Sequence, residues 1–442
     1  MASCCLWRGR YGRIAMSFTP TRRAALLGGA YAVAGTLVSL SARPVFAAGR
    51  TLKIGIVSPQ TGPMAAFAEP TGFVIARILE ATGGTIENGG IRYPLEIVER
   101  DTQSNPNRAA EVTQELILSE GVDIILCYGG PENTNPASDQ CELNGVPCLA
   151  SDVPIEPWFF GRNGDPKKGF DYTYCAFFDV NTYSSAMLAF MDKIAPGASV
   201  GGLWPNDADG VVLSQAFSKG FGAAGYTIVD PGRFDLPTSS FSTQIAKFRD
   251  SGVEIVQGIM PPPDFTLFWT QCAQQGFQPR AMIAGKSSEY PASVQPLGEK
   301  AVGVSVPIWW TPDFPYVSSV DGTTALETAR RYEAETGRQW TAGIGSRYAM
   351  LEVLVDTLRR AENLDNPESV STALGATKLE TICGTIDFST GPVPNSAKLG
   401  LVSVQWVKAA EDSAFPYDMA VVENSFHPAV PVSREPFPIP YS

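Results

Sequence analysis

The chain has 442 residues, and its 45 acidic and 33 basic residues give a formal charge of −12 at pH 7. Residues 1–47 hold six arginines and no acid, so the rest carries 27 basic against 45 acidic residues, a formal charge of −18. Such a charge repels nucleic acid and anionic lipid, which argues against nucleic acid as a partner. About 395 residues suit two domains of ordinary size.

The first 47 residues have the pattern of a twin-arginine export signal. The pair Arg22-Arg23 precedes a weakly apolar run over 24–42, and small residues allow cleavage just after Ala47. An uncleaved N-terminal anchor is the alternative, and Met16 is a second possible start. With a cleaved signal or with an uncleaved anchor, the rest of the chain is expected outside the cytoplasm, in the periplasm. Beyond Ala47 no apolar run approaches the ~18 residues of a spanning helix.

From residue 52 strand-like and helix-like segments alternate. Strands are expected over 52–57, 93–100, 122–128 and 146–150, and helices over 65–81, 106–120 and 135–143. Strands that alternate with longer helices are typical of a right-handed parallel α/β sheet.

The alternation restarts after residue 182. Helices are expected over 183–194, 211–224, 241–251 and 265–276, and strands over 199–204, 227–230, 255–259 and 281–284. A further helix over 346–361 and strands near 385–388 and 402–407 indicate that the chain crosses back between two sheets. We predict an α/β fold with one lobe of 48–177 plus about 312–385, and another of 178–311 plus about 386–442. Ligands of parallel sheets bind beyond the carboxyl ends of the strands, so facing lobes predict a cleft that closes by hinge motion.

Five loop segments carry a resemblance to a known family. They are Ile54-Gly-Ile-Val-Ser-Pro-Gln-Thr-Gly-Pro with Phe67, Arg100-Asp-Thr-Gln-Ser-Asn-Pro, Gly129-Gly-Pro-Glu-Asn-Thr-Asn-Pro-Ala-Ser-Asp, Pro205-Asn-Asp-Ala-Asp-Gly and Gln274-Gln-Gly-Phe-Gln-Pro-Arg. Their order and spacing resemble the leucine/isoleucine/valine-binding family, the type I periplasmic solute-binding proteins of ABC importers. The resemblance implies the type I periplasmic-binding-protein fold, with two doubly wound parallel-sheet lobes joined by crossover hinge strands. It also implies a monomeric periplasmic receptor, without cofactor or metal, that presents a small-molecule solute to ABC permease subunits.

By position, the resemblance implies a pocket with contributions from both lobes. The first lobe would supply Phe67, Tyr128, Gly129, Gly130, Pro131, Glu132 and Asp152, and the second Asp209, Met260, Pro261, Lys286 and Trp309. Amino-acid-binding members hold the α-carboxylate with hydroxyl and backbone groups on the first loop, where this chain has Gly-Gly-Pro-Glu. They also place an acid near the position of Lys286 to hold the α-ammonium. A lysine there would bind an anion instead, so leucine-like recognition is not expected.

The residues themselves leave several interpretations open. Lys286 is a solvated surface group, an anion-binding group, or the partner of Glu132, Asp152 and Asp209 in a pair that closes the cleft. The aromatic residues at expected loops and strand ends line the cleft or pack in the core: Phe67, Trp158, Phe159, Phe160, Trp204, Trp269, Trp309, Trp310 and Trp340. Of the adjacent pair Trp309 and Trp310, one is expected to face the cleft and the other to pack.

Catalytic motifs are not found. The only histidine is His427 in the tail, and the sequence has no Gly-x-Ser-x-Gly elbow, Walker loop or His-Glu-x-x-His. We therefore predict a solute-binding protein for a small organic anion or amino-acid-like zwitterion, with a cationic or neutral solute as the alternative. A ligand-sensing receptor of the same fold and an exported hydrolase that depends on His427 are the other candidates.

The cysteines beyond residue 47 are dispersed. None of the six is in a Cys-x-x-Cys motif, so they do not predict a zinc or redox site. Export permits disulfides, and a bridge between Cys141 and Cys148 is expected.

Overall fold

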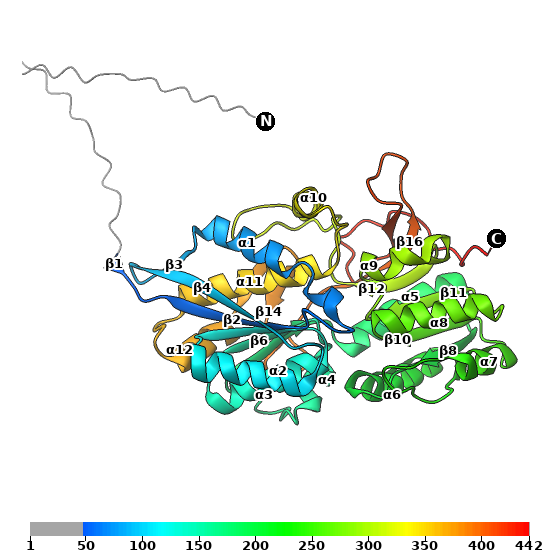
Figure 1. The fold of residues 1–442 in the computed structure, drawn as a ribbon, viewed down its shortest axis with the longest axis horizontal. Coiled ribbons are helices and arrows are strands. Elements are labelled where there is room, and N and C mark those ends of the chain that lie inside the picture. The colour runs from blue at the N-terminus through cyan, green and yellow to red at the C-terminus, as the bar shows by residue number, and fades with distance from the viewer. Residues whose placement is uncertain (1–46, 442) are drawn as a thin grey trace, which may run out of the picture. The chain divides into compact units, whose positions relative to one another are not determined.

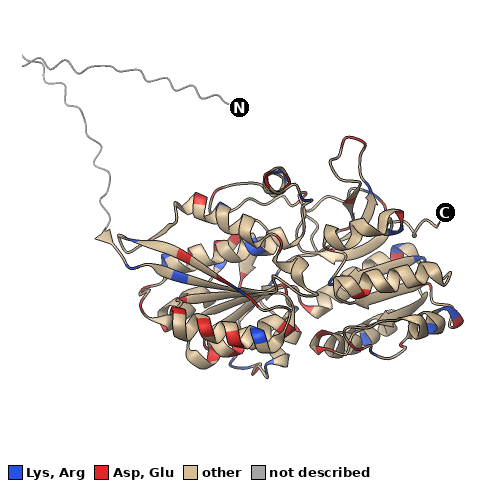
Figure 2. Cartoon of the chain, viewed as in Figure 1, with Lys and Arg blue, Asp and Glu red and all other residues tan. Residues whose placement is uncertain are grey.

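The computed structural model describes residues 47–441, which fall in one compact unit. The predicted export signal, apart from its last residue, lies outside the described residues. Two sheets flanked by helices make up the described part (Figure 1), and acidic residues occur on helices beside both sheets (Figure 2). Within that part no helix has the length and apolar character needed to cross a membrane.

The first sheet has the strand order β1-β4-β2-β5-β6-β7-β15, with β3 beside β4. Its strands are β1 (Ala47–Ala48), β2 (Leu52–Ser58), β3 (Thr85–Asn88), β4 (Ile91–Asp101), β5 (Ile124–Tyr128), β6 (Cys148–Ser151), β7 (Thr173–Phe177) and β15 (Ser396–Lys398). All pairs are parallel except β3–β4. Strands β2, β5 and β6 are buried along most of their length, because helices cover both faces of a parallel sheet.

The helices of the first lobe come from distant parts of the chain. They are α1 (Thr71–Thr82), α2 (Pro106–Glu115), α3 (Pro131–Asn144), α4 (Ile155–Gly161), α11 (Gly343–Arg360) and α12 (Pro367–Gly375). Helices α1 and α11 pack together on one face, and α2 and α3 on the other (Figure 1). A small hairpin of β13 (Lys378–Thr381) and β14 (Gly384–Asp387) follows α12.

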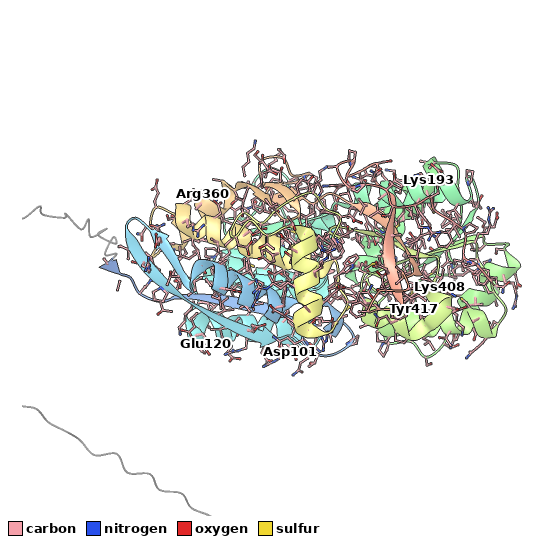
Figure 3. The ribbon with its side chains drawn as sticks, turned by 90° about the horizontal axis from the view of Figure 1, so that it is seen from above. Asp101, Glu120, Lys193, Arg360, Lys408 and Tyr417 are labelled. Atoms are coloured by element: carbon pink, nitrogen blue, oxygen red, sulfur yellow. The ribbon has the colours of Figure 1, made fainter. Side chains whose placement is uncertain are left out.

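The second sheet has the order β17-β16-β12-β11-β10-β8-β9. Its strands are β8 (Ser199–Leu203), β9 (Thr227–Val229), β10 (Ile255–Ile259), β11 (Ala281–Gly285), β12 (Val304–Ile308), β16 (Val402–Lys408) and β17 (Tyr417–Glu423). The first five are parallel, and β16 and β17 add an antiparallel edge where Lys408 pairs with Tyr417 (Figure 3). The helices that accompany this sheet are α5 (Val180–Ile194), α6 (Ala208–Ala223), α7 (Ser242–Asp250), α8 (Pro262–Gln274) and α9 (Pro291–Val294). Helix α10 (Ala325–Thr336) instead contacts α1 of the first lobe, where Arg331 pairs with Glu80.

The chain passes between the sheets three times: after β7, after β12 and after β15. The predicted two-lobe α/β fold with crossover strands is therefore confirmed. The third passage comes later than the predicted position near residue 385. Strand β15 pairs in parallel with β7, so residues 396–398 still belong to the first sheet.

Three predicted local elements differ from those found. The helix expected over 65–81 is a short 3-10 turn (Ala65–Ala68) followed by α1, because Pro70 lacks an N–H for a continuous helix. Helix α3 begins at Pro131, where the missing N–H costs nothing, so the expected loop over 129–132 is partly helical. Trp158, Phe159 and Phe160, expected in loops or strand ends, lie on α4.

The predicted disulfide between Cys141 and Cys148 is not formed. All six cysteines among residues 47–441 are buried free thiols. Cys148 lies on β6 with its sulfur 3.7 Å from that of Cys127 on β5, a contact far longer than the ~2.05 Å of a disulfide. Burial raises the pKa of both thiols well above the ordinary value, so they stay protonated.

Candidate functional site

Segments that follow the carboxyl ends of strands in both sheets line one cavity of about 40 Å³. Its lining residues are Phe67, Gly130, Asp152, Pro154, Phe177, Phe178, Tyr183, Asp209, Leu213, Ile259, Lys286, Glu289 and Trp309. Phe67, Gly130 and Asp152 follow β2, β5 and β6 of the first sheet, whereas Lys286 and Trp309 follow β11 and β12 of the second. The cavity thus belongs to both lobes and lies where parallel sheets bind ligands.

A buried lysine joins the two lobes beside this cavity. The Nζ of Lys286 lies 2.9 Å from Glu132 on α3 of the first lobe and 2.7 Å from Asp209 on α6 of the second. Asp207 is a third carboxylate at 3.8 Å. Burial alone would lower the pKa of Lys286, but these carboxylates outweigh it and raise that pKa well above its ordinary value. Of the three interpretations of Lys286, the structure shows the ion pair between lobes.

Burial dominates the protonation of the carboxylate that faces Lys286. It raises the pKa of Asp209 to about 7, even though the ammonium of Lys286 acts in the opposite direction. Asp209 lies in the first turn of α6, and Lys286 donates a hydrogen bond to only one of its two carboxylate oxygens. Proton occupancy at this position therefore changes near neutral pH.

A second buried ion pair fixes the first-lobe wall. Arg347 on α11 donates to the carboxylate of Asp152, and its other nitrogens reach the Phe67 carbonyl oxygen at 2.5 Å and Thr71 Oγ1 at 3.3 Å. The guanidinium also lies 3.7 Å from the ring centroid of Tyr128. Arg347 thus ties α11 to two cavity-lining residues, Phe67 and Asp152. Arg347 was not predicted from the sequence, because no local motif marks a mid-helix arginine 195 residues from its partner.

Unpaired carboxylate oxygens converge on the cavity. Asp152 Oδ1, Asp209 Oδ1 and Glu289 Oε2 are buried and have no hydrogen-bond partner among the described residues. Glu289 Oε1 accepts from the backbone N–H of Lys286 at 2.9 Å, and burial raises the pKa of Glu289 to about 7. Buried polar atoms without partners are rare and costly, so a cluster of them in a cavity indicates a ligand site. Glu289 was not predicted from the sequence, although this residue follows the same strand as Lys286.

Aromatic rings form the rest of the wall. Phe177 packs edge-on against Trp309 with ring centroids 4.6 Å apart, and Phe178 stacks on Tyr183 at 4.4 Å. Trp309 lines the cavity whereas Trp310 packs against Trp340, the arrangement expected for this adjacent pair. The remaining tryptophans of the candidate set lie outside the lining: Trp158 donates to Ser138, Trp204 to Gln257 and Trp269 to the Lys300 carbonyl.

The structure gathers about half of the predicted site residues around the cavity. Those that line it are Phe67, Gly130, Asp152, Asp209, Lys286 and Trp309. Glu132 and Tyr128 reach it indirectly, through Lys286 and Arg347. The others are not in the lining: Gly129, Pro131, Met260 and Pro261. Gly129 packs against Pro59, where an added Cβ would approach within 2.7 Å, so its absence of a side chain serves a close backbone contact.

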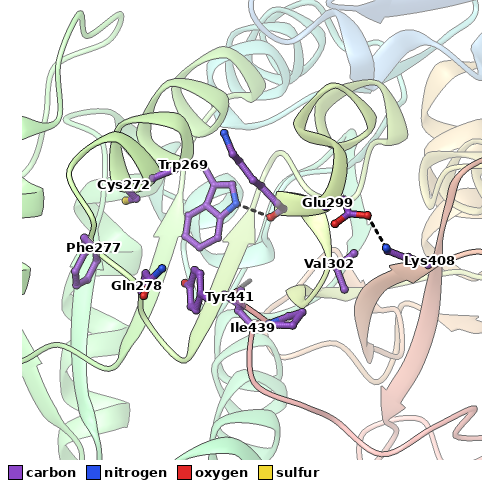
Figure 4. Close-up of a pocket in the computed structure, with 12 residues that line it drawn as sticks. Trp269, Cys272, Phe277, Gln278, Glu299, Val302, Lys408, Ile439 and Tyr441 are labelled. Carbon is purple, nitrogen blue, oxygen red and sulfur yellow. Dashed lines mark hydrogen bonds and ion pairs between the residues drawn. The ribbon is translucent and has the colours of Figure 1, made fainter.

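A roomier cavity of about 500 Å³ lies in the second lobe, between α8, the segment before β12 and the C-terminal tail (Figure 4). Trp269, Phe277 and Tyr441 surround it, and the Glu299–Lys408 ion pair lies at its side. None of its lining residues has a buried polar atom without a partner in the described part of the chain. Of the two cavities, the smaller one between the lobes is therefore the candidate site for a polar ligand.

His427, on which a hydrolase would depend, packs at a crossover. Its ring stacks on Phe314 at 4.9 Å, and Nε2 lies 2.8 Å from the hydroxyl of Tyr316. It is not among the residues that line the inter-lobe cavity. Nor do residues 47–441 contain a group of three or more His, Cys, Asp or Glu that could hold a metal ion.

Comparisons with known proteins agree with this fold. Leu/Ile/Val-binding protein homolog 8 of Brucella suis biovar 1 (strain 1330) is 23% identical over 410 residues, which cover 88% of this chain and 96% of the relative. The solved leucine-binding protein of Thermotoga maritima MSB8 superimposes with a TM-score of 0.70 at 21% identity, covering 85% of this chain and 99% of that one. A solute-binding protein of an ABC transporter from Rhodopseudomonas palustris BisB5, solved with 3,4-dihydroxybenzoic acid, gives 0.69 at 18%, with 87% and 99% covered.

The family profile described as periplasmic binding protein matches residues 51–409, most of the chain. Members of this family are solute-binding proteins. With two crossed-over α/β lobes and a polar cavity between them, this chain belongs to the periplasmic binding protein family, as the resemblance of its loops predicted.

Proposed function

We propose that the chain is an extracytoplasmic receptor that captures a small-molecule solute between its lobes and delivers it to an ABC permease in the inner membrane. The cavity supports this proposal, because buried carboxylate oxygens and aromatic rings from both lobes meet there. Solved structures of similar fold add further support, since a substrate-binding protein of Streptococcus pneumoniae was solved with isoleucine and the one of Rhodopseudomonas palustris BisB5 with 3,4-dihydroxybenzoic acid.

Binding requires the cavity walls to move. A cavity of about 40 Å³ holds only a few water molecules, since one needs about 10–15 Å³, so a solute of amino-acid size needs rearranged side chains or separated lobes. A ligand shifts an open–closed equilibrium only by its differential affinity for the closed form. Moving it from about 1:99 to about 99:1 takes about 5.5 kcal/mol, which calls for several contacts from both lobes.

A binding screen tests the proposal. The chain from residue 48 onward is melted in the presence of amino acids, aromatic acids, amines, sulfonates and betaines. A solute at about 100 times its Kd stabilises the native state by about 2.7 kcal/mol. Small-angle scattering with the best solute should then show a more compact particle. No stabilisation by any solute, or an unchanged scattering profile at saturation, would contradict solute capture between lobes.

Transport and sensing are separated by a second experiment. Cells that lack the chain should lose uptake of the identified solute at low concentration, and the purified chain should stimulate ATP hydrolysis by the permease complex in liposomes. Normal uptake in the deleted strain, together with a lost transcriptional response to the solute, would favour the ligand-sensing receptor.

A further inference from the structure

The cationic groups beside the inter-lobe cavity are already paired within the protein. Lys286 is held by Glu132 and Asp209, and Arg347 by Asp152 and the Phe67 carbonyl. The neighbouring hydroxyls of Ser287 and Ser288 donate to the Ala284 carbonyl instead of facing the cavity. A solute carboxylate would therefore find no free cation here and would have to break an existing pair.

The first-lobe helix terminus is also blocked against anions. The N-terminus of α3 begins at Pro131 beside Gly130, and helix N-termini attract negative charge. Here the protein's own carboxylate takes that place: a Cβ built on Gly130 would stand 2.7 Å from Glu132 Oε2. The N–H of Gly130 donates to the Asp152 carbonyl at 2.8 Å. The Gly130 N–H and the space beside it are therefore already taken by groups of the protein.

Four buried polar atoms of the lining have no partner among the described residues: three accept hydrogen bonds, and one, the indole N–H of Trp309, donates. Three buried carboxylate oxygens lack partners, one from Asp152 in the first lobe and two from Asp209 and Glu289 in the second. With Lys286 as the only base in the lining, three acids leave it negative when all are ionised. Faces of aromatic rings such as Phe67 and Trp309 add attraction for a cation.

From these observations, and on the basis of the proposed function, we infer that the solute is a small organic cation, an amine, amidine or guanidine whose N–H groups donate to the cavity, rather than a carboxylic acid. Lys286 shows how the site holds such a group, since one ammonium has three carboxylates within 3.8 Å. The N–H groups of the solute complete the hydrogen bonds of Asp152, Asp209 and Glu289, and so link the lobes.

Proton release or uptake on binding distinguishes a cationic solute from an anionic one. Burial raises the pKa of both Asp209 and Glu289 to about 7, so each carries a proton for part of the time at neutral pH. A bound cation favours the ionised carboxylates, and its binding releases protons. A bound anion favours the protonated forms, and its binding takes protons up.

The test compares solutes that share a body and differ in charge. Isothermal titration at pH 7 measures 3-methylbutylamine against 4-methylpentanoate, 2-phenylethylamine against 3-phenylpropionate, and benzamidine against benzoate. Two buffers of different ionisation enthalpy report the proton count. We expect each base to bind at least ~10-fold tighter than its acid counterpart, the ratio of a charge-assisted hydrogen bond, with protons released.

Substituting Glu289 tests whether the preference for bases arises in the cavity. Glu289→Gln keeps an oxygen that can accept from the Lys286 N–H but removes the charge, and it should weaken the bases by ~10- to 100-fold. The matched control is Glu299→Gln, an exposed glutamate paired with Lys408, which should leave affinities unchanged. If Glu289→Gln fails to fold, the comparison on the parent chain decides.

The outcomes separate this inference from the proposed function. Tighter binding of the acids, or proton uptake on binding, overturns the inference and leaves solute capture standing. Binding of none of these bases overturns the inference, and it overturns the proposed function as well only when no solute of the wider screen stabilises the chain.

Discussion

Replacing Lys286 with methionine should expose the energetics of the inter-lobe ion pair. Methionine keeps an unbranched apolar stem but removes an ammonium that lies 2.7 Å from Asp209 and 2.9 Å from Glu132. The Lys286 side chain is only 6% exposed, so the two carboxylates would remain near the interior without a counter-charge. Removing one partner of a buried pair typically costs about 3–5 kcal/mol, and we expect that loss in the free energy of unfolding.

The pH dependence of this loss follows from Asp209. Its pKa in the folded chain, about 7, is already above the ordinary 3.8, and removal of the ammonium raises it further. A carboxyl group whose pKa is higher in the folded than in the unfolded state binds its proton more tightly when folded. Its contribution therefore declines as pH rises through the interval between the two values. The loss caused by Lys286→Met should be largest above pH about 7 and shrink toward pH about 5.

Urea unfolding followed by tryptophan fluorescence at pH 5 and pH 8 measures both effects. The control is Lys408→Met, whose ion pair with Glu299 is exposed and screened by water and should therefore contribute little to stability at either pH. Adding Asp209→Asn to Lys286→Met should recover part of the loss, because the uncompensated charge is removed. A loss no larger than that of Lys408→Met, or one equal at both pH values, would refute this reasoning.

Three further predictions concern other parts of the chain. Gly345→Ala on α11 should lower the free energy of unfolding by about 1–3 kcal/mol, because the new Cβ would stand 2.2 Å from Trp310. Its control is Gly72→Ala on α1, where a Cβ meets no atom within 4 Å; this variant should be neutral or stabilising in the same urea assay. Alkylation in denaturant without reductant should label all six thiols of the exported chain. If only four were labelled, two cysteines would be joined, as the sequence predicted for Cys141 and Cys148. Substituting lysine for both Arg22 and Arg23 should abolish export, which is checked by cell fractionation; for the parent, N-terminal sequencing should begin just after Ala47.

Local patterns predicted most of the fold, because apolar runs and helical spacing report burial on one element at a time. The strands of both sheet centres and the main helices were found in this way. Strand β15 could not be, since its three residues are a strand only through pairing with β7, more than 200 residues earlier. The break at Pro70 was readable from the sequence, because proline interrupts a helix wherever it stands in the interior.

The predicted site residues came from the family resemblance of the loops, and the rule about strand ends agrees with it for three of them. Asp152, Lys286 and Trp309 follow strands, and the structure brings all three to one cavity. Arg347 lies in the middle of α11, and only the packing of that helix against the first sheet carries it to Asp152. The partners of Lys286 also depend on how two lobes meet, which no single segment encodes.

Hydrogen exchange followed by mass spectrometry tests most directly whether a solute is held by both lobes. With the tightest solute of the screen, exchange should slow in peptides that contain Gly130 and Asp152 of the first lobe and in those that contain Asp209 and Lys286 to Glu289 of the second. Slowing confined to one lobe, or found instead around Trp269 and Tyr441 at the roomier cavity, would contradict the account.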